Sequence, residues 1–191
     1  SAACTSAGTQ DRRGVVFTRN CTEAINLVAY AWARRELRRG DRILCSVMEH
    51  HSNLVPWQMA ARDTGAEIDY LPVTDDGYLD LSGLDKLLTR RTRMVAISGA
   101  SNVLGTVYDL ERLIAAAHAV GALVLVDGAQ LVPHATVDFD SLGADFLAVA
   151  GHKMLGPTGI GALVARPELL ESMEPFMGGG TTIVEGSRLG M

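Results

Sequence analysis

Cysteine is scarce in this sequence, and the few cysteines form no closely spaced pair. The three are Cys4, Cys21 and Cys45; they include no CxxC motif, and an odd number cannot all pair within one chain. This distribution argues against a disulfide framework and against a zinc ribbon. It favours a reducing compartment, so we expect a cytoplasmic protein.

Long apolar runs and long blocks of like charge are also missing. The longest apolar stretches have the length of a strand, which predicts no membrane contact. The first residues, SAACTSAGTQDRR, lack the apolar segment of a signal peptide. The 17 basic and 22 acidic residues give a formal net charge of −5 without a basic stripe. This charge pattern argues against a nucleic-acid partner.

What the sequence does contain is a regular alternation of strand-like and helix-like segments. Its 191 residues, 48% of them hydrophobic, are enough for one sizeable core. From about Gly14 the strand-like segments are VVFT, RILCSV, EIDYLPV, RMVAIS, ALVLVD and DFLAVA. The helix-like segments between them are TEAINLVAYAWARREL, LVPWQMAARDTG, SGLDKLLT and LERLIAAAHAVG, and Gly40, Gly65 and Gly121 follow three of these. This alternation predicts an α/β fold with a mostly parallel sheet covered by helices on both faces.

Lys153 lies where the last of these strands gives way to a glycine-rich segment, GHKMLGPTGIG. Glycine and proline there argue against any continuing element, so we expect Lys153 at a strand end, on a loop. A solvated loop lysine is the common alternative. In a partly desolvated pocket, however, its pKa would fall and the amine could form a Schiff base.

Asp127 ends the apolar strand ALVLVD, 26 residues before Lys153. A carboxylate on a buried strand needs a cationic partner, unless it caps the next helix, which is the simpler interpretation. An acid for a pyridinium nitrogen and a lysine for an aldehyde are the two groups that pyridoxal phosphate requires. The strand ends therefore indicate a site for this cofactor.

Three further segments place polar residues directly after a predicted strand. FTRNCTEAINL places a polar turn before a helix that begins near Thr22, which suits a phosphate unless Asn20 or Thr22 is a plain N-cap. His50 and His51 follow a strand without metal-ligand spacing, and one of them could stack on a flat ring. Asn102 could bind a ring hydroxyl or a substrate carboxylate, unless it is an ordinary turn residue.

Together these segments resemble the cysteine desulfurases of class V aminotransferase ancestry, and their sulfur-mobilising branch in particular. The matching motifs, in order from about Val15 to Gly180, are FTRNCTEAINLVA, MEHHSNLVPWQ, SNVLGT, VDGAQLVPH and GHKMLGPTGIG. The resemblance implies the large domain of a fold-type I pyridoxal-phosphate enzyme, a three-layer α/β/α structure. A Rossmann-type nucleotide binder is disfavoured, because no GxGxxG opens a helix after a strand.

The resemblance also implies roles around the cofactor ring. Lys153 would hold pyridoxal phosphate as a Schiff base and later move protons as a catalytic residue. Asp127 would pair with the pyridinium nitrogen, and Gln130 would bond the phenolic oxygen. His50 would stack over the ring, whereas His51 receives no contact.

The phosphate and the substrate would be bound by the remaining motif residues. Thr22 and His152 would bind the phosphate, and Cys21 would contribute its backbone N–H. Asn102 would help to hold the substrate's carboxylate. Ala150 departs from the family, which usually has a hydroxyl residue there, so one phosphate contact would be missing.

The activity implied is conversion of L-cysteine to L-alanine, with the sulfur held as a persulfide for iron–sulfur cluster assembly or another transfer. The partners would be a second copy of the chain and a sulfur-acceptor protein. A selenocysteine lyase, another class V lyase, or a non-catalytic remnant that only folds or binds cofactor would look similar.

The same resemblance sets the expected domain limits. We expect an irregular segment over residues 1–13, the cofactor-binding large domain over 14–180 and a truncated tail over 181–191. In the family, the persulfide cysteine and a carboxylate-binding arginine belong to a small C-terminal domain, which this sequence does not contain.

Overall fold

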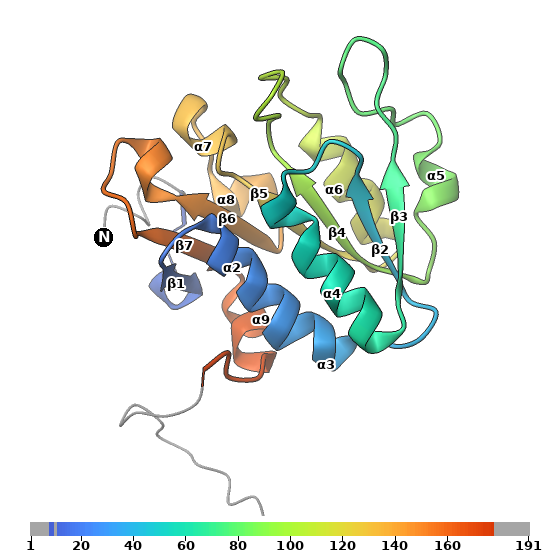
Figure 1. The fold of residues 1–191 in the computed structure, drawn as a ribbon, viewed down its shortest axis with the longest axis horizontal. Helices are drawn as coiled ribbons and strands as arrows, with labels where there is room; N and C mark the ends of the chain where they lie inside the picture. The colour runs from blue at the N-terminus through green and yellow to red at the C-terminus, as the bar shows by residue number, and fades with distance from the viewer. Residues whose placement is uncertain (1–7, 10, 178–191) are drawn as a thin grey trace, which may run out of the picture.

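The core of the protein is one mixed sheet. The structure is a computed structural model that describes residues 8–9 and 11–177. In this part of the chain a seven-stranded sheet runs in the order β1-β7-β6-β5-β4-β2-β3 (Figure 1). Its strands are β1 (Val15–Thr18), β2 (Arg42–Ser46), β3 (Glu67–Leu71), β4 (Thr92–Ser98), β5 (Leu123–Asp127), β6 (Phe146–Ala150) and β7 (Gly161–Ala165). The strands from β2 to β6 pair in parallel, as predicted, whereas β7 and β1 close one edge antiparallel.

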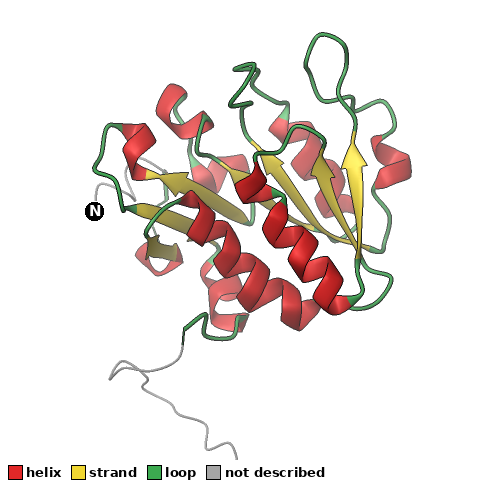
Figure 2. Ribbon diagram, in the orientation of Figure 1, coloured by secondary structure: helices red, strands yellow, loops and turns green. Residues whose placement is uncertain are grey.

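Helices cover both faces of this sheet, which confirms the three-layer prediction (Figure 2). One face carries α2 (Cys21–Val28), the π-helical turn η2 (Ala29–Ala33), α3 (Arg34–Glu36), α4 (Val55–Thr64) and α9 (Pro167–Ser172). The other carries α5 (Leu84–Leu87), α6 (Leu110–Ala119), α7 (Leu131–His134) and α8 (Phe139–Leu142). Short 3₁₀ turns are η1 (Arg12–Gly14), η3 (His51–Asn53) and η4 (Gly151–Met154). None of the helices within the described residues has the length and apolar character to cross a membrane.

The two faces divide the core according to the two-residue period of a strand. On β5, Val124 and Val126 pack in one buried cluster, and Leu125 packs in the other. On β6 the same alternation separates Leu147 from Phe146. Because both faces are buried, these strands have no polar face, which explains their near-continuous apolar sequences.

A predicted helix end is confirmed by a glycine in the left-handed conformation. Gly65 has φ +77° and ends α4, where its N–H bonds the carbonyl of Ala61. The predicted helix over residues 22–37 is also present, with the wide turn η2 in its middle. The predicted tail 181–191 lies outside the described residues, whereas Arg12 and Arg13, expected to be irregular, belong to η1.

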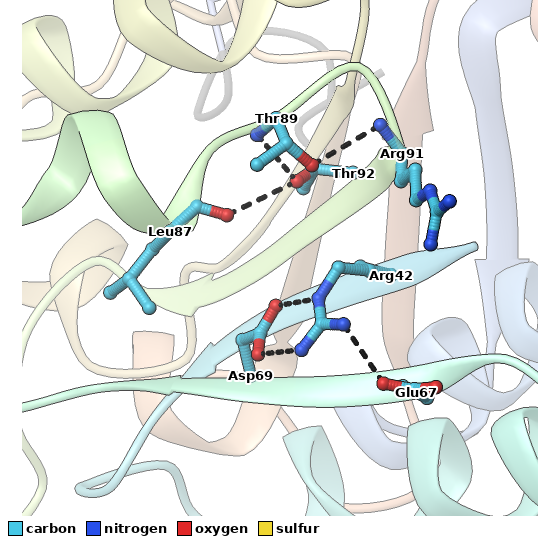
Figure 3. Close-up of polar contacts among 7 residues, drawn as sticks. All are labelled: Arg42, Glu67, Asp69, Leu87, Thr89, Arg91 and Thr92. Atoms are coloured by element: carbon cyan, nitrogen blue, oxygen red, sulfur yellow. Dashed lines mark hydrogen bonds and ion pairs between the residues drawn. The ribbon is translucent and has the colours of Figure 1, made fainter. Parts of the chain in front are cut away.

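A polar cluster fixes the edge of the sheet opposite the strand ends named above (Figure 3). Thr92 is buried at the start of β4; its Oγ1 accepts from the N–H of Thr89 at 3.0 Å and donates to the carbonyl of Leu87 at 3.3 Å. Nearby, Arg42 of β2 pairs with Asp69 and Glu67 of β3. These contacts set where β2, β3 and β4 begin.

Thr92→Val is expected to lower the free energy of unfolding by about 1–3 kcal/mol, because it leaves a backbone donor and a backbone acceptor unpaired. Urea unfolding measures this change. Thr89→Val is the matched control: Thr89 is exposed, and its Oγ1 accepts only from the N–H of Arg91. A loss at Thr92 no larger than at Thr89 would contradict the assigned role.

Candidate functional site

A cavity lies where the carboxyl ends of the central strands meet, the usual place for ligands in such sheets. Its volume is about 250 Å³. The eight residues predicted for the site all line it: Cys21, Thr22, His50, Asn102, Asp127, Gln130, His152 and Lys153. Six further residues line the cavity. Asn20 had been considered as an N-cap and Ala150 as the position of a missing phosphate contact, whereas Ser52, Ser98, Ala100 and Ala129 were not predicted.

Lys153 lies in a helical turn and not on a loop, so that expectation was wrong. The turn η4 begins directly after β6, and the N–H of Gly156 bonds back to the carbonyl of Gly151 at 2.9 Å. Leu155 ends the turn with φ +60°, a left-handed conformation that is unfavourable for a residue other than glycine. A continuous hydrogen-bonded turn after the strand therefore places Lys153 on the cavity wall.

The sequence had left open whether Lys153 lies in a partly desolvated pocket or in solvent, and in the structure Lys153 is exposed. The parallel pairing of β5 with β6 nevertheless brings it to the same cavity as Asp127, as the strand order predicts.

Asp127 is 5% exposed and has no ion-pair partner among the described residues. Its Oδ1 accepts from the N–H of Ala129 at 2.9 Å and from the thiol of Cys21 at 3.2 Å. The sequence had left open whether Asp127 pairs with a cation or caps the next helix. The structure shows a cap-like bond to the turn after β5 and, among the described residues, no ion pair to Asp127, although the Lys153 amine belongs to the same cavity.

Cys21 contributes its side chain to this arrangement, whereas only its backbone N–H had been expected to act. Burial, and then the neighbouring Asp127 carboxylate, raise the pKa of the Cys21 thiol well above its ordinary value. The thiol therefore stays protonated and donates to Asp127. The sequence could not show this contact, because the two residues are 106 positions apart.

The helix after β1 begins at Cys21, and Asn20 is its N-cap. The Asn20 side chain accepts from the N–H of Glu23 at 2.8 Å, which decides between the two caps considered above. The N–H groups of Cys21 and Thr22 precede the first intrahelical bond, at the positive end of the helix dipole, and both residues line the cavity.

Gly161 is what lets this helix start approach the sheet. A Cβ at that position would lie 2.6 Å from the carbonyl carbon of Asn20 and 2.8 Å from the oxygen of Val149. Both neighbours are backbone atoms, which cannot rotate away. Glycine is therefore required here for the turn to reach the cavity.

Four polar side chains of the cavity form no hydrogen bond with the described residues: Thr22, Asn102, Gln130 and His152. Three are exposed, and Gln130 is half-buried. Ala150 lines the same wall without a hydroxyl. The wall thus presents donors and acceptors that the fold itself does not use.

His50 lies between β2 and α4, directly before η3. Its Nδ1 accepts from the N–H of Ser52 at 3.1 Å and contacts the Ser52 hydroxyl at 2.7 Å, so the neutral ring carries its proton on Nε2. The ring is exposed at the cavity. His51 is exposed too but does not line the cavity.

Glu49, which was not among the predicted site residues, is buried beside His50 with 8% exposure. Burial raises the pKa of its carboxyl, and hydrogen bonds from Ser46, Ser98 and Asn53 act in the opposite direction. An acidic residue beside the two histidines of MEHH is a signal that the sequence offered. Its contact with Ser98, 49 residues away, could not be seen in the sequence.

Glu49→Gln is expected to change the pH dependence of stability. With the pKa of Glu49 raised by folding, the folded chain binds more protons than the unfolded chain above about pH 4.3, the usual glutamate value. Wild-type stability therefore falls as pH rises through this window, whereas glutamine does not titrate. Urea unfolding between about pH 4 and about pH 8 should show that the free energy of unfolding of the variant increases with pH relative to that of wild type. A constant difference would contradict the raised pKa.

Comparison with known proteins agrees with this geometry. Residues 6–188 match the aminotransferase class-V family. A cysteine desulfurase of Dickeya dadantii is 53% identical over 173 residues, which are 91% of this chain and 42% of that protein. The cysteine desulfurase CsdA from Escherichia coli superposes with a TM-score of 0.93 at 45% identity, covering 97% of this chain and 47% of that one.

A structure of a C-DES mutant, with glycine covalently linked to its pyridoxal phosphate, matches with a TM-score of 0.82 at 27% identity. It covers 91% of this chain and 46% of that one. The chain thus spans less than half the length of these relatives. Because the family match extends over nearly the whole sequence, the chain belongs to the aminotransferase class-V family.

Proposed function

We propose that this chain is the pyridoxal-phosphate-binding part of a cysteine desulfurase. The observation that carries the proposal is the cavity that contains both the Lys153 amine and the buried Asp127 carboxylate, which forms no ion pair with a group of opposite charge among the described residues. A protonated pyridine nitrogen would supply that charge. The donor set therefore fits this cofactor better than it fits a neutral ligand.

The unused polar groups of the cavity match the rest of the cofactor. The free N–H groups at the start of α2, the Thr22 hydroxyl and His152 would bind the phosphate. Gln130 would bond the ring hydroxyl, and His50 would stack on the ring. Since Ala150 offers no hydroxyl, the phosphate would lose one contact that relatives of this type usually have.

Bound pyridoxal phosphate supplies an electron sink for the bonds at Cα of an amino acid. Lys153 would first carry the cofactor covalently and then, as a free amine, accept the Cα proton. Its exposure leaves the amine accessible for both tasks. Asp127 would keep the pyridine nitrogen protonated, and Asn102 would bind the substrate's carboxylate.

The whole protein would convert L-cysteine to L-alanine and pass the sulfur, as a cysteine persulfide, to an acceptor protein in the cytoplasm, for iron–sulfur cluster assembly among other uses. It would act as a homodimer. Cys21 and Cys45 are both buried with raised thiol pKa, which makes them poor nucleophiles. The persulfide would form on a cysteine outside the described residues.

Equilibrium dialysis of the chain against pyridoxal phosphate tests the binding proposal. We expect saturable binding of one cofactor per chain. Formation of L-alanine from L-cysteine by the full-length protein then tests the reaction. Unsaturable binding, with no more cofactor retained than by an unrelated protein of similar lysine content, would contradict the proposal.

A further inference from the structure

The buried Glu49 carboxylate is a point where three elements meet. It accepts hydrogen bonds of 2.7 Å from Ser46 Oγ, from Asn53 Nδ2 and from Ser98 Oγ. Ser46 ends β2, Asn53 ends η3, and Ser98 ends β4. The segment of residues 47–52, which contains His50, is therefore tied at both of its ends to one side chain.

These partners are themselves held firmly. Asn53 is fully buried, and its Oδ1 accepts from the indole N–H of Trp57 at 3.1 Å. Trp57 is in turn fully buried on α4. Ser98 lines the cavity. Glu49 thus connects the segment to the packed core on one side and to the cavity wall on the other.

The contacts of His50 itself are local. Its ring bonds Ser52, and its carbonyl accepts from the N–H of Asn53 at 2.8 Å. Toward β4 and the elements that follow it, the segment has two side-chain hydrogen bonds: the short bond from Ser98 to Glu49, and a 3.9 Å contact from the Tyr108 hydroxyl to the sulfur of Met48. The Glu49 bond is the strong one, because sulfur is a weak acceptor.

We infer that Glu49 is a positioning residue, which fixes the segment of residues 47–52 so that the His50 ring lies against the cavity. Glu49 does not line the cavity, so it acts through His50. The part of this inference that concerns pyridoxal phosphate rests on the proposed function. The position of His50 itself is a property of the chain without cofactor.

A double-mutant cycle tests whether Glu49 acts through His50. Glu49→Ala should weaken pyridoxal phosphate binding about tenfold in the wild-type background, and less than about twofold in the His50→Ala background. A purely structural effect would be equal in both backgrounds. An undiminished loss of affinity in the His50→Ala chain would overturn the inference.

Glu49→Gln is the conservative variant and should retain affinity within about twofold. Its amide oxygen can accept from Asn53 and Ser98, and its N–H can donate to the second lone pair of Ser46 Oγ. A loss equal to that of Glu49→Ala would contradict positioning by hydrogen bonds. Glu171→Ala, an exposed change on α9, is the control and should alter nothing.

The NMR signals of the His50 ring in the cofactor-free chain give a readout that does not depend on the proposed function. Glu49→Ala should shift them, and Glu49→Gln should leave them in place. If wild type binds no cofactor but these shifts occur, the proposed function fails and the positioning role stands. Unchanged His50 signals in Glu49→Ala would refute the positioning role. If Glu49→Ala does not fold, Ser98→Ala is used in its place, because it removes one of the three hydrogen bonds to Glu49. It should shift the same His50 signals by a smaller amount.

Discussion

Lys153→Ala is expected to abolish covalent retention of pyridoxal phosphate. The sequence contains two lysines, Lys86 and Lys153, and only Lys153 lines the cavity. Because an aldehyde is captured by an amine, removing this amine leaves the cofactor with non-covalent contacts alone. Gel filtration after incubation measures the loss: cofactor should stay with wild type and separate from the variant.

Lys86→Ala is the matched control for this result. Lys86 is exposed on α5 and does not line the cavity, so its removal should leave cofactor retention unchanged. Retention by Lys153→Ala equal to that of wild type would show that another group captures the cofactor.

Asp127→Asn is expected to weaken pyridoxal phosphate binding about hundredfold. Breaking a buried charge pair by neutralising one partner costs about 3 kcal/mol or more, and each 1.4 kcal/mol is about tenfold in affinity. The asparagine oxygen can still accept from Ala129 and Cys21, so the turn after β5 keeps its bonds. The loss should therefore concern binding and not folding.

Thermal unfolding distinguishes a loss of cofactor binding from a loss of folding. In the cofactor-free chain Asp127 is a buried carboxylate that forms no ion pair with the described residues, so Asn should leave the midpoint of thermal unfolding unchanged or raise it. Asp140→Asn, an exposed change on α8, is the control for both measurements. An Asp127→Asn chain that binds as tightly as wild type would remove the main argument for a pyridinium partner.

Local sequence patterns predicted the parts of this fold that depend on local chemistry. The apolar strands, the helix ending at Gly65 and the chain order of the motifs follow from periodicity and turn residues. These same features placed Asp127 and Lys153 at adjacent strand ends. The strand β7 and the helices α7 to α9 were not predicted, because each is short and lies next to glycine or proline, where local patterns are weak.

The contacts that the sequence could not show join residues far apart along the chain. The Cys21 thiol reaches Asp127 only because α2 packs over β6 and β7, next to β5, and Glu49 reaches Ser98 only because β4 lies beside β2. The exposure of Lys153 depends on what covers η4, which no local pattern encodes. Motifs therefore identified the cavity residues, whereas pairing and burial required the three-dimensional structure.

The most direct test of the account is to locate the lysine that captures the cofactor. The chain is incubated with pyridoxal phosphate, reduced with borohydride and digested, and the modified peptide is identified by mass. We predict one adduct per chain on the peptide that contains Lys153, with Lys86 unmodified. Equal labelling of both lysines, or labelling of Lys86 alone, would contradict the assignment of this cavity as the cofactor site.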